Sequence, residues 1–489
     1  MNPFRHSRTW LAAALCGAVA ATSLPAAEAE RLNVLLICVD DLKPTLGCYG
    51  DAHAKTPHLD RFAKRALRLD LAYCNQAVCA PSRNALVTGL RPQTIGIYDL
   101  PTHFRRGAPD AVTLGQHFRA HGYRTEALGK VMHTGHGNTE DAASWTVPHW
   151  RPRAPGYALA ENNAPVPENR NREQPWRNPR GAATEAADVP EDTYADGLTA
   201  RETARRLEAA AASDEPFLIV AGFLKPHLPF VAPQRYWDLH DPDSLPMPER
   251  DSPPEGAPDY AGNPGGELRN YKDIPAGTKP LGEELTRHLI HGYYAATSYV
   301  DAQIGLVLEA LESHGLADST VVALWGDHGW HLGDHGFWCK HTNYEQAARI
   351  PLLVAAPGRA GAASEALVET VDIYPTLAEL AGLPLPEDIE GRSFAALLDD
   401  PAAPHRDHAI HVYPRGNRFG RAIRTPRHRL VEWRPLRGDS DEVDWELYDY
   451  LEDPAESRNL AAERPEIVAE LAALLATHPD PKPQIRGAE

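Results

Sequence analysis

Two adjacent carboxylates, Asp40 and Asp41, stand directly after the apolar segment 32–39, which has the composition of a buried parallel strand. Neighbouring carboxylates repel each other and lose hydration when they are buried, so a positive charge must compensate them. A hard cation would do so, because carboxylate oxygens are the ligands that Ca²⁺ and Mg²⁺ prefer. A helix cap beside a solvated aspartate is the alternative interpretation.

A second pair of ligand-type side chains has the same placement. Asp327 and His328 follow the apolar segment 320–325 and are flanked by Gly326 and Gly329. The carboxyl ends of parallel strands meet at one edge of a sheet, where α/β proteins bind their ligands. The two pairs therefore predict one metal site. An imidazole suits transition metals better than calcium, so zinc stays open, although the chain has neither a C-x-x-C nor an H-E-x-x-H segment.

A cysteine motif lies between the two pairs. Residues 79–83 read Cys-Ala-Pro-Ser-Arg and precede a short helical stretch at 84–88. Cys79 lies near a helix start, where backbone N–H groups favour an anion, and Arg83 follows one turn later. From these residues alone, Cys79 could be a thiolate nucleophile beside a cation. A buried structural cysteine is the alternative.

These motifs together resemble a known family. Residues 79–83, continued by Thr-Gly-Leu-Arg-Pro at 88–92, resemble the signature of type I sulfatases of the alkaline phosphatase superfamily, in which this cysteine is oxidised to Cα-formylglycine. The upstream pair 40–41 and the Asp-His-Gly segment 327–329 match the family order. A more specific likeness is to iduronate-2-sulfatases, and it rests on segments 76–78, 129–133, 225–230, 335–340, 422–425 and 446–449.

The resemblance implies a ligand set for one divalent cation. Asp40, Asp41, Asp327 and His328 would bind Ca²⁺, and an oxygen of the formylglycine at position 79 would also contact the ion. Many family members have asparagine where His328 stands, whereas the iduronate-type branch has histidine.

The resemblance also implies catalytic helpers. Arg83 would stabilise the formylglycine hydrate, and Lys130 and Lys340 would bind sulfate oxygens. His133 and His227 would move protons, with His227 as the acid for the leaving alcohol. Taken singly, each of these side chains has an ordinary alternative as a solvated loop or turn residue.

A third group of side chains flanks the motifs and is expected at the substrate. These residues could meet a sulfate, a carboxylate or a sugar face, or be solvated loop residues instead. They are Lys225, Trp338 and His103, with Arg105, Arg106 and His341 beside them.

Strand-like and helical segments alternate along most of the chain. Strands are expected at 32–39, 67–73, 124–128, 217–222, 320–325 and 351–355, and helices at 113–121, 193–212, 284–314 and 372–381. This alternation predicts an α/β fold with a large, mainly parallel (mixed) sheet sandwiched by helices, which the resemblance makes alkaline-phosphatase-like. Two stretches rich in Pro, Gly and charge, 134–190 and 240–282, are expected to be long loops.

The two ends of the chain differ from this pattern. Residues 1–29 have a basic start, a short apolar run and an Ala-Glu-Ala site, as in a secretory signal peptide. An N-terminal membrane anchor is the alternative, and no later run is long enough to span a bilayer. The catalytic domain is expected at 30–400. Residues 401–489 are expected to form a smaller α+β subdomain with an antiparallel sheet, from strands at 408–413, 422–433 and 445–448 and a helix at 466–477.

The net charge of the chain argues against some classes of function. The chain has 67 acidic and 49 basic residues and a net charge of −18, which argues against nucleic-acid binding. Such a surface would not attract a polyanion from a distance, so chain ends or short oligosaccharides are the expected substrates. A signal peptide predicts export to the periplasm or the extracellular space. In an exported protein a Cys48–Cys74 disulfide is conceivable, although sequence does not decide the pairing.

The leading hypothesis is therefore an exported sulfatase acting on a sulfated carbohydrate, with a 2-O-sulfated terminal uronic acid as the specific guess. It needs a formylglycine-generating or sulfatase-maturing enzyme as a partner. Two alternatives stay open: a phosphate or phosphonate ester hydrolase of the same superfamily, and a sulfated-glycan binding protein in which Cys79 is never converted.

Overall fold

The computed structural model describes residues 31–163, 181–436 and 442–486. The expected signal peptide at 1–29 lies outside these ranges. Within them, no helix has both the length and the apolar character that a membrane crossing requires.

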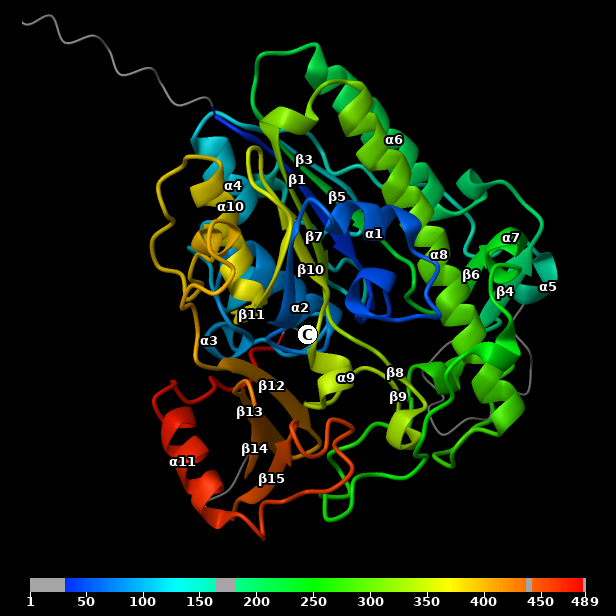
Figure 1. Ribbon diagram of the computed structural model, residues 1–489, viewed down its shortest axis with the longest axis vertical. Coiled ribbons are helices and arrows are strands. Elements are labelled where there is room, and N and C mark those ends of the chain that lie inside the picture. Colours follow the sequence, from blue (N-terminus) through cyan, green and yellow to red (C-terminus); the bar gives the residue numbers. More distant parts are fainter. Residues whose placement is uncertain (1–30, 164–180, 437–441, 487–489) are drawn as a thin grey trace, which may run out of the picture. The chain divides into compact units, whose positions relative to one another are not determined.

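A seven-stranded sheet lies at the centre of the α/β region (Figure 1). Its strands are β1 (Asn33–Val39), β2 (Leu67–Tyr73), β3 (Arg124–Gly129), β5 (Phe217–Phe223), β7 (Thr320–Gly326), β10 (Leu352–Ala355) and β11 (Ala362–Glu369). They are ordered β11-β2-β10-β7-β1-β5-β3, and only β10 runs antiparallel to its neighbours. The predicted mainly parallel, mixed sheet is confirmed. Strand β11 was not predicted, because this edge strand mixes Ala, Ser and Glu and is only partly buried.

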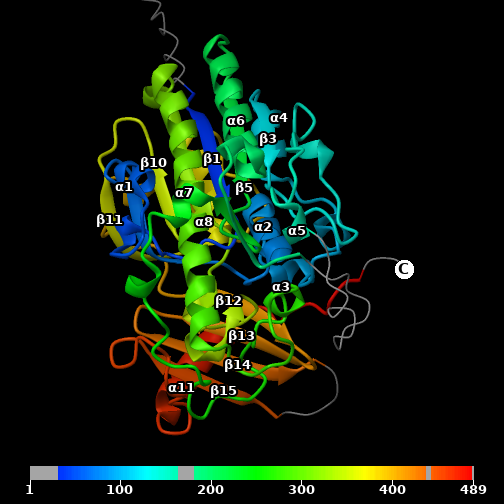
Figure 2. The same cartoon turned by 90° about the vertical axis from the view of Figure 1, so that its right-hand side faces the viewer.

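Helices cover both faces of the sheet. They are α1 (Pro57–Ala63), α2 (Cys79–Thr88), α3 (Pro92–Ile95), α4 (Leu114–Ala120), α6 (Ala195–Ala211), α8 (Glu283–Ser313) and α10 (Ile373–Leu380). Alternate side chains of β1 point to opposite faces, as the period of a strand requires. Leu36 packs in the core under α2, α4 and α10, and Leu35 packs in the core under α1, α6 and α8. Figures 1 and 2 show these two groups of helices on opposite sides of the sheet. This burial on both faces explains the continuous apolar run of β1.

A second sheet follows towards the C-terminus. It consists of β12 (Ala409–Arg415), β13 (Arg418–Arg424), β14 (His428–Pro435) and β15 (Asp444–Asp449), all antiparallel, with α11 (Pro465–Leu475) packed on it. The predicted antiparallel subdomain is confirmed, but the single strand expected at 422–433 is wrong. A turn at Thr425 separates β13 from β14, because Pro426 has no N–H for a sheet hydrogen bond. The boundary expected at 400–401 stays a prediction.

Shorter elements connect these layers. They are β4 (Thr184–Ala187) paired with β6 (Phe230–Pro233), β8 (His331–Leu332) paired with β9 (Trp338–Cys339), and the helices α5 (Ala160–Asn163), α7 (Gln234–Trp237) and α9 (Glu345–Ala348). The cysteines in the described ranges are all free. A Cys48–Cys74 disulfide is absent there because Cys48 packs against the core on one face of the large sheet and Cys74 belongs to the core on the other.

Candidate active site

The two acidic strand ends predicted to meet do meet. Strands β1 and β7 are parallel neighbours in which Val39 pairs with Gly326, so the residues that follow leave the sheet side by side. The backbone N–H of Asp41 donates a 2.9 Å hydrogen bond to Oδ1 of Asp327. Asp40, Asp41 and Asp327 are fully buried. Asp41 has a φ of +62°, a left-handed conformation that aspartate tolerates better than most residues.

The N-terminus of helix α2 brings Cys79 to the same place. The Sγ atom of Cys79 lies 3.5 Å from Nε2 of His328. Potential ligand atoms of Asp40, Cys79, Asp327 and His328 lie within 4.8 Å of one another, and Asp41 belongs to a second, overlapping group. The predicted ligand residues are thus gathered in one cluster. Burial raises the pKa of the Cys79 thiol, and the charge of Asp40 adds to this effect, so the unmodified side chain is poorly suited to be a thiolate nucleophile.

Arg83 donates hydrogen bonds to two of the buried carboxylates. Its Nε donates to Asp327 and its Nη2 donates to Asp40, both at 3.0 Å. Its Nη1 donates to the carbonyl oxygens of Lys130 and Val131. Because its side chain is fully buried and these partners occupy its nitrogen atoms, Arg83 fixes the cluster. It does not line the cavity beside Cys79.

The carboxylates have the electrostatics of a cation site. Burial raises the pKa of Asp41 to about 7 and also raises that of Asp327. The pKa of Asp40 is well below its usual range because Lys130 and Arg83 outweigh its burial. Two of the three carboxylates are therefore under-compensated by the cations of the chain. Three carboxylates with one imidazole fit a divalent cation that prefers oxygen.

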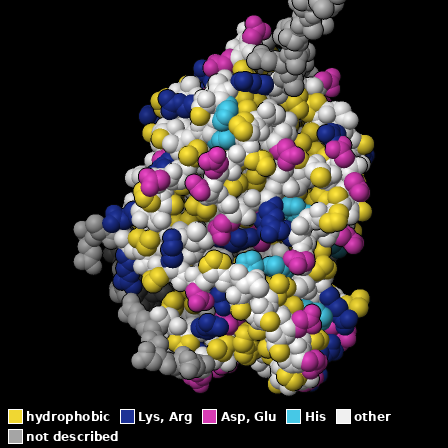
Figure 3. All heavy atoms as spheres, turned by 90° about the vertical axis from the view of Figure 1, so that its left-hand side faces the viewer, with side chains coloured by type: hydrophobic (Ala, Val, Ile, Leu, Met, Phe, Trp, Pro, Cys, Tyr) yellow, Lys and Arg dark blue, Asp and Glu magenta, His cyan; other side chains and the backbone are white. Residues whose placement is uncertain are grey.

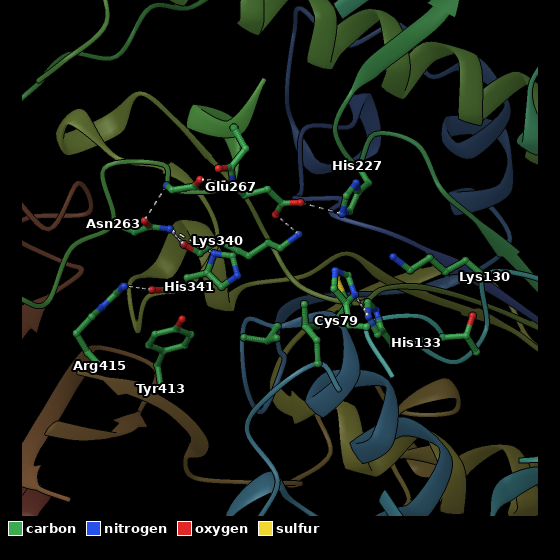
Figure 4. Close-up of a pocket in the computed structure, with 16 residues that line it drawn as sticks. Cys79, Lys130, His133, His227, Asn263, Glu267, Lys340, His341, Tyr413 and Arg415 are labelled. Atoms are coloured by element: carbon green, nitrogen blue, oxygen red, sulfur yellow. Dashed lines mark hydrogen bonds and ion pairs between the residues drawn. The ribbon is translucent and has the colours of Figure 1, made fainter. Parts of the chain in front are cut away.

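Two lysines reach the cluster from separate loops. The Nζ atom of Lys340 lies 2.9 and 3.0 Å from the carboxylate oxygens of Asp41, and it also lies 5.0 Å from the centre of the Trp330 ring. The Nζ atom of Lys130, which follows β3, donates to Asp40. Both lysines line a cavity of about 970 Å³ that opens at Cys79, so both ammonium groups face the space where a substrate would lie (Figure 4).

Two histidines line the same cavity. Nδ1 of His227 donates to the carbonyl oxygen of Leu228, which leaves Nε2 facing the site, 3.5 Å from Glu267 and 3.9 Å from Asp41. Burial, reinforced by the charge of Lys130, lowers the pKa of His133 to about 3, so His133 is a neutral imidazole that can accept a proton. Both predicted proton-transfer residues are thus beside Cys79 (Figure 4).

Comparison with known proteins identifies this arrangement. Residues 32–383 match the family described as Sulfatase, and residues 333–478 match the family described as N-sulphoglucosamine sulphohydrolase, C-terminal. The chain belongs to the sulfatase family. Human iduronate 2-sulfatase is 32% identical over 548 residues, which cover 94% of this chain and 97% of the human protein. This sulfatase is therefore a sulfuric ester hydrolase.

Solved structures share the fold of this sulfatase. One, in complex with its substrate D-glucosamine-2-N,6-O-disulfate, has a TM-score of 0.73 at 23% identity and covers 91% of this chain and 97% of that chain. The phosphonate monoester hydrolase of Agrobacterium radiobacter has a TM-score of 0.72 at 22% identity, with 91% and 95% covered. At these identities the likeness concerns the fold alone.

Three residues expected at the substrate do not line the cavity of this sulfatase. The Nζ atom of Lys225 donates to the carbonyl oxygens of His227 and Pro229, so it braces the loop that carries His227. Trp338 is buried in a hydrophobic core. His103 accepts a hydrogen bond from the N–H of Arg105 and stacks on Phe104. Arg105 pairs with Asp141, and Arg106 does not line the cavity.

Other cavity residues were not found by sequence reasoning. Glu267 and Asn263 lie in the stretch expected to be a loop, where no motif marks them. Tyr413 and Arg415 stand at the end of β12, in a region assigned only to the C-terminal sheet. The one available signal was the expected pocket-wall position of His341, which does line the cavity.

Proposed function

We propose that this protein is an exported sulfatase that hydrolyses sulfate esters of sulfated carbohydrates through a formylglycine hydrate at position 79. The observation that carries the proposal is the convergence of Asp40, Asp41, Asp327 and His328 on Cys79, with Lys130 and Lys340 facing the same cavity. Those four residues would hold one divalent cation, for which we propose Ca²⁺. The cation would supply positive charge that offsets the negative oxygens of a sulfate ester.

The first half of the reaction is transfer of the sulfuryl group. One hydroxyl oxygen of the residue-79 hydrate attacks sulfur and gives its proton to a carboxylate of the cluster, as the bond from sulfur to the alcohol oxygen breaks. Lys130 and Lys340 stabilise the sulfate oxygens as charge shifts. His227 donates the proton from Nε2 to the leaving alcohol, and Glu267 lies 3.5 Å from that nitrogen, where its carboxylate can orient the imidazole.

The second half restores the aldehyde. His133 removes the proton from the remaining hydroxyl of residue 79, the C=O double bond forms again, and sulfate leaves with the electron pair of the bond that joined its bridging oxygen to the carbon of residue 79. Water then adds to the aldehyde to regenerate the hydrate. A plain cysteine or serine lacks the second hydroxyl that this step requires. We assign Arg83 to positioning, because its hydrogen bonds go to Asp40, Asp327 and backbone oxygens.

For the substrate, we propose a 2-O-sulfate on a terminal uronic acid. Support comes from the 32% identity to human iduronate 2-sulfatase over nearly the whole chain. Export would use the signal peptide at 1–29, and conversion of Cys79 would need a formylglycine-generating or sulfatase-maturing enzyme.

The decisive experiment tests both the modification of Cys79 and the hydrolysis of the proposed substrate. Peptide mass spectrometry across residues 75–83 of protein from its native host should find formylglycine at position 79, whereas an unmodified thiol there would favour a binding protein. The converted enzyme with Ca²⁺ should cleave saccharides with 2-O-sulfated uronate ends. Activity confined to galactose or glucosamine sulfates would refute the substrate, and faster cleavage of aryl phosphate than of aryl sulfate would refute the reaction.

A further inference from the structure

One arginine of the active-site cavity has no carboxylate partner. Arg415, the last residue of β12, lines the same cavity as Cys79. Its Nη2 donates to the backbone oxygen of His341, and its guanidinium lies 5.0 Å from the centre of the Tyr413 ring. Its Nε is buried without a hydrogen-bond partner. In the part of the chain that the structure describes, no ion pair is formed by this side chain.

Arg415 is half-buried, and most of the fully buried arginines in the described residues differ from it in this respect. Five of them each pair with a carboxylate: Arg83, Arg91, Arg421, Arg424 and Arg429. Buried Arg269 donates to three backbone oxygens. A guanidinium stays charged at any relevant pH, and a desolvated N–H without an acceptor is costly. The charge of Arg415 therefore favours an anion in the cavity that it lines.

His341, whose backbone oxygen accepts a hydrogen bond from Arg415, adds a second donor to the cavity. Asn263 accepts the N–H of Gly265 through Oδ1, which directs its Nδ2 towards Nδ1 of His341 at 3.3 Å. His341 thus accepts at Nδ1 and carries its hydrogen on Nε2. Burial holds the pKa of His341 well below its usual range, and Lys340 reinforces this, so the ring is a neutral donor. Glu267, the acidic residue among those that line the cavity, pairs with Lys340 and His227.

The position of this group separates it from the reacting sulfate. In the view of Figure 4, Arg415 and Tyr413 lie on one side of His341, and Cys79 and Lys130 lie on the other. The cavity of about 970 Å³ is large enough for more than a sulfate group alone. A saccharide with its sulfate ester at residue 79 would therefore extend towards Arg415.

We propose that Arg415, with His341 and Tyr413, binds a second anionic group of the saccharide whose sulfate ester lies at residue 79. That group is a carboxylate or a second sulfate, both of which match the planar fork of a guanidinium. This inference rests on the proposed function and narrows it to saccharides that carry two anionic groups close together.

The test measures binding without turnover. Cys79→Ala removes the nucleophile, so calorimetric dissociation constants can be measured with intact ligands in this background and in Cys79→Ala with Arg415→Gln. Four probes separate the sources of charge: a disaccharide ending in a 2-O-sulfated uronate, the same disaccharide with that carboxyl reduced to an alcohol, glucosamine-2-N,6-O-disulfate, and glucosamine 6-O-sulfate.

We expect Arg415→Gln to weaken binding of one dianionic probe by about 10- to 100-fold, and to weaken its monoanionic counterpart much less. The pair that shows the difference identifies the group as carboxylate or sulfate. Arg415→Lys, which keeps the charge but not the fork, should lose an intermediate amount. Equal weakening of all four probes, or no weakening of any, would overturn the subsite.

Two controls keep the result interpretable. Arg434→Gln alters an exposed arginine of the same sheet that pairs with Glu432 and lies outside the cavity, so it should leave all four dissociation constants unchanged. Thermal unfolding of each variant checks that it folds. Turnover is assayed separately with the converted enzyme: if no sulfate ester is cleaved while the Arg415 effect persists, the proposed reaction fails and the anion subsite stands.

Discussion

Asp327 accepts a 3.0 Å hydrogen bond from Nε of Arg83, and neither side chain is exposed to solvent. The same guanidinium donates to Asp40, so one side chain of α2 fixes the carboxylates that follow β1 and β7. The helix that carries Cys79 is thereby tied to the ligands on the sheet. Small errors in ligand position weaken metal binding strongly, so this link makes Arg83 a positioning residue for the whole site.

Arg83→Lys should weaken Ca²⁺ binding by about 10- to 100-fold, because one ammonium group cannot reach both carboxylates and the two backbone oxygens. The unfolding free energy without Ca²⁺ should fall by about 2 kcal/mol, since buried acceptors lose their donors. Calorimetric Ca²⁺ titration and urea unfolding measure the two effects. Arg205→Lys, in an exposed pair with Glu202, is the matched control. Unchanged Ca²⁺ affinity in Arg83→Lys would contradict this role.

Removal of the divalent cation should destabilise the protein as well as inactivate it. Three buried carboxylates would then be offset by side chains of the protein alone, chiefly by Arg83, Lys130 and Lys340. A ligand that binds only the folded state stabilises it in proportion to the logarithm of its concentration above Kd. Thermal unfolding with a chelator should therefore show a lower Tm that rises with each tenfold addition of Ca²⁺. A Tm independent of Ca²⁺ would exclude a cation at this cluster.

Glu267→Gln should slow hydrolysis of poor leaving groups more than that of good ones. Glu267 lies 3.5 Å from Nε2 of His227 and 3.2 Å from Nζ of Lys340, so its carboxylate can orient the imidazole that acts as the acid. A phenol with a low pKa needs little help from an acid, whereas a sugar alcohol needs a proton. We expect kcat to fall about 10- to 100-fold for a sugar sulfate and about threefold or less for a nitrophenyl sulfate.

His227→Ala should show the same pattern with a larger loss on the sugar sulfate. A purely structural effect of either variant would lower both activities by one factor, and that result would remove His227 from the role of acid. Gln234→Ala, on the short helix α7 outside the cavity, serves as the control on the same part of the chain.

The parts of the site that sequence could predict are those carried by strand ends and motifs. Asp40 and Asp327 follow apolar runs that fit strands of a sheet covered on both faces, so their meeting could be inferred from the sequence. Glu267 and Arg415 could not, because they reach the cavity from an irregular segment and from the second sheet. Their place depends on how distant parts of the chain pack, which neither period nor spacing encodes.

Two residues expected at the substrate lie elsewhere, because their place also depends on how the chain packs. Trp338 and His103 were assigned to the pocket because they are close to motifs in sequence. Trp338 lies on the short strand β9, two residues before Lys340, but the left-handed backbone of Cys339 (φ +70°) interrupts the strand between them, and Trp338 packs into a core that also contains Leu332. Proximity to a motif along the chain therefore predicted the right segment, but it did not predict which way each side chain points.

The carboxylate of Glu140 should stabilise the folded protein near pH 7, and this contribution to the free energy of unfolding should be lost in acid. Burial raises its pKa, but hydrogen bonds from His149, Trp145 and Arg151 outweigh this and lower it from 4.5 to about 2. A lowered folded-state pKa stabilises the protein above the unfolded value and loses that contribution as the pH falls through the folded value. The contribution at pH 7 is of the order of 3 kcal/mol. His149 also contacts the backbone oxygen of Gly129, so this network supports the segment that carries Lys130.

Urea unfolding of the wild type and Glu140→Gln measures this contribution directly. The difference between them should be largest near pH 7 and should narrow as the pH falls from 5 to 3. Glu215→Gln, at an exposed position, should show no such difference at any pH. A difference that stays constant over this pH range would show that Glu140 acts by packing and not by charge.

At low salt, kcat/KM per chain end should not increase with the length of a polyanionic substrate. The chain has 67 acidic and 49 basic residues, and on the face drawn in Figure 3 the acidic side chains are scattered over the surface. Such a surface gives no long-range attraction for a polyanion, and the positive groups of Lys130, Lys340 and Arg415 lie together in the cavity. Measured per chain end, kcat/KM should stay level or fall from disaccharide to dodecasaccharide at about 10 mM salt. Raising the salt to about 150 mM should remove any fall, because the screening length shortens from about 30 Å to about 8 Å. A value that rises with length at low salt, and loses that rise when salt is added, would instead require a basic track leading to the cavity.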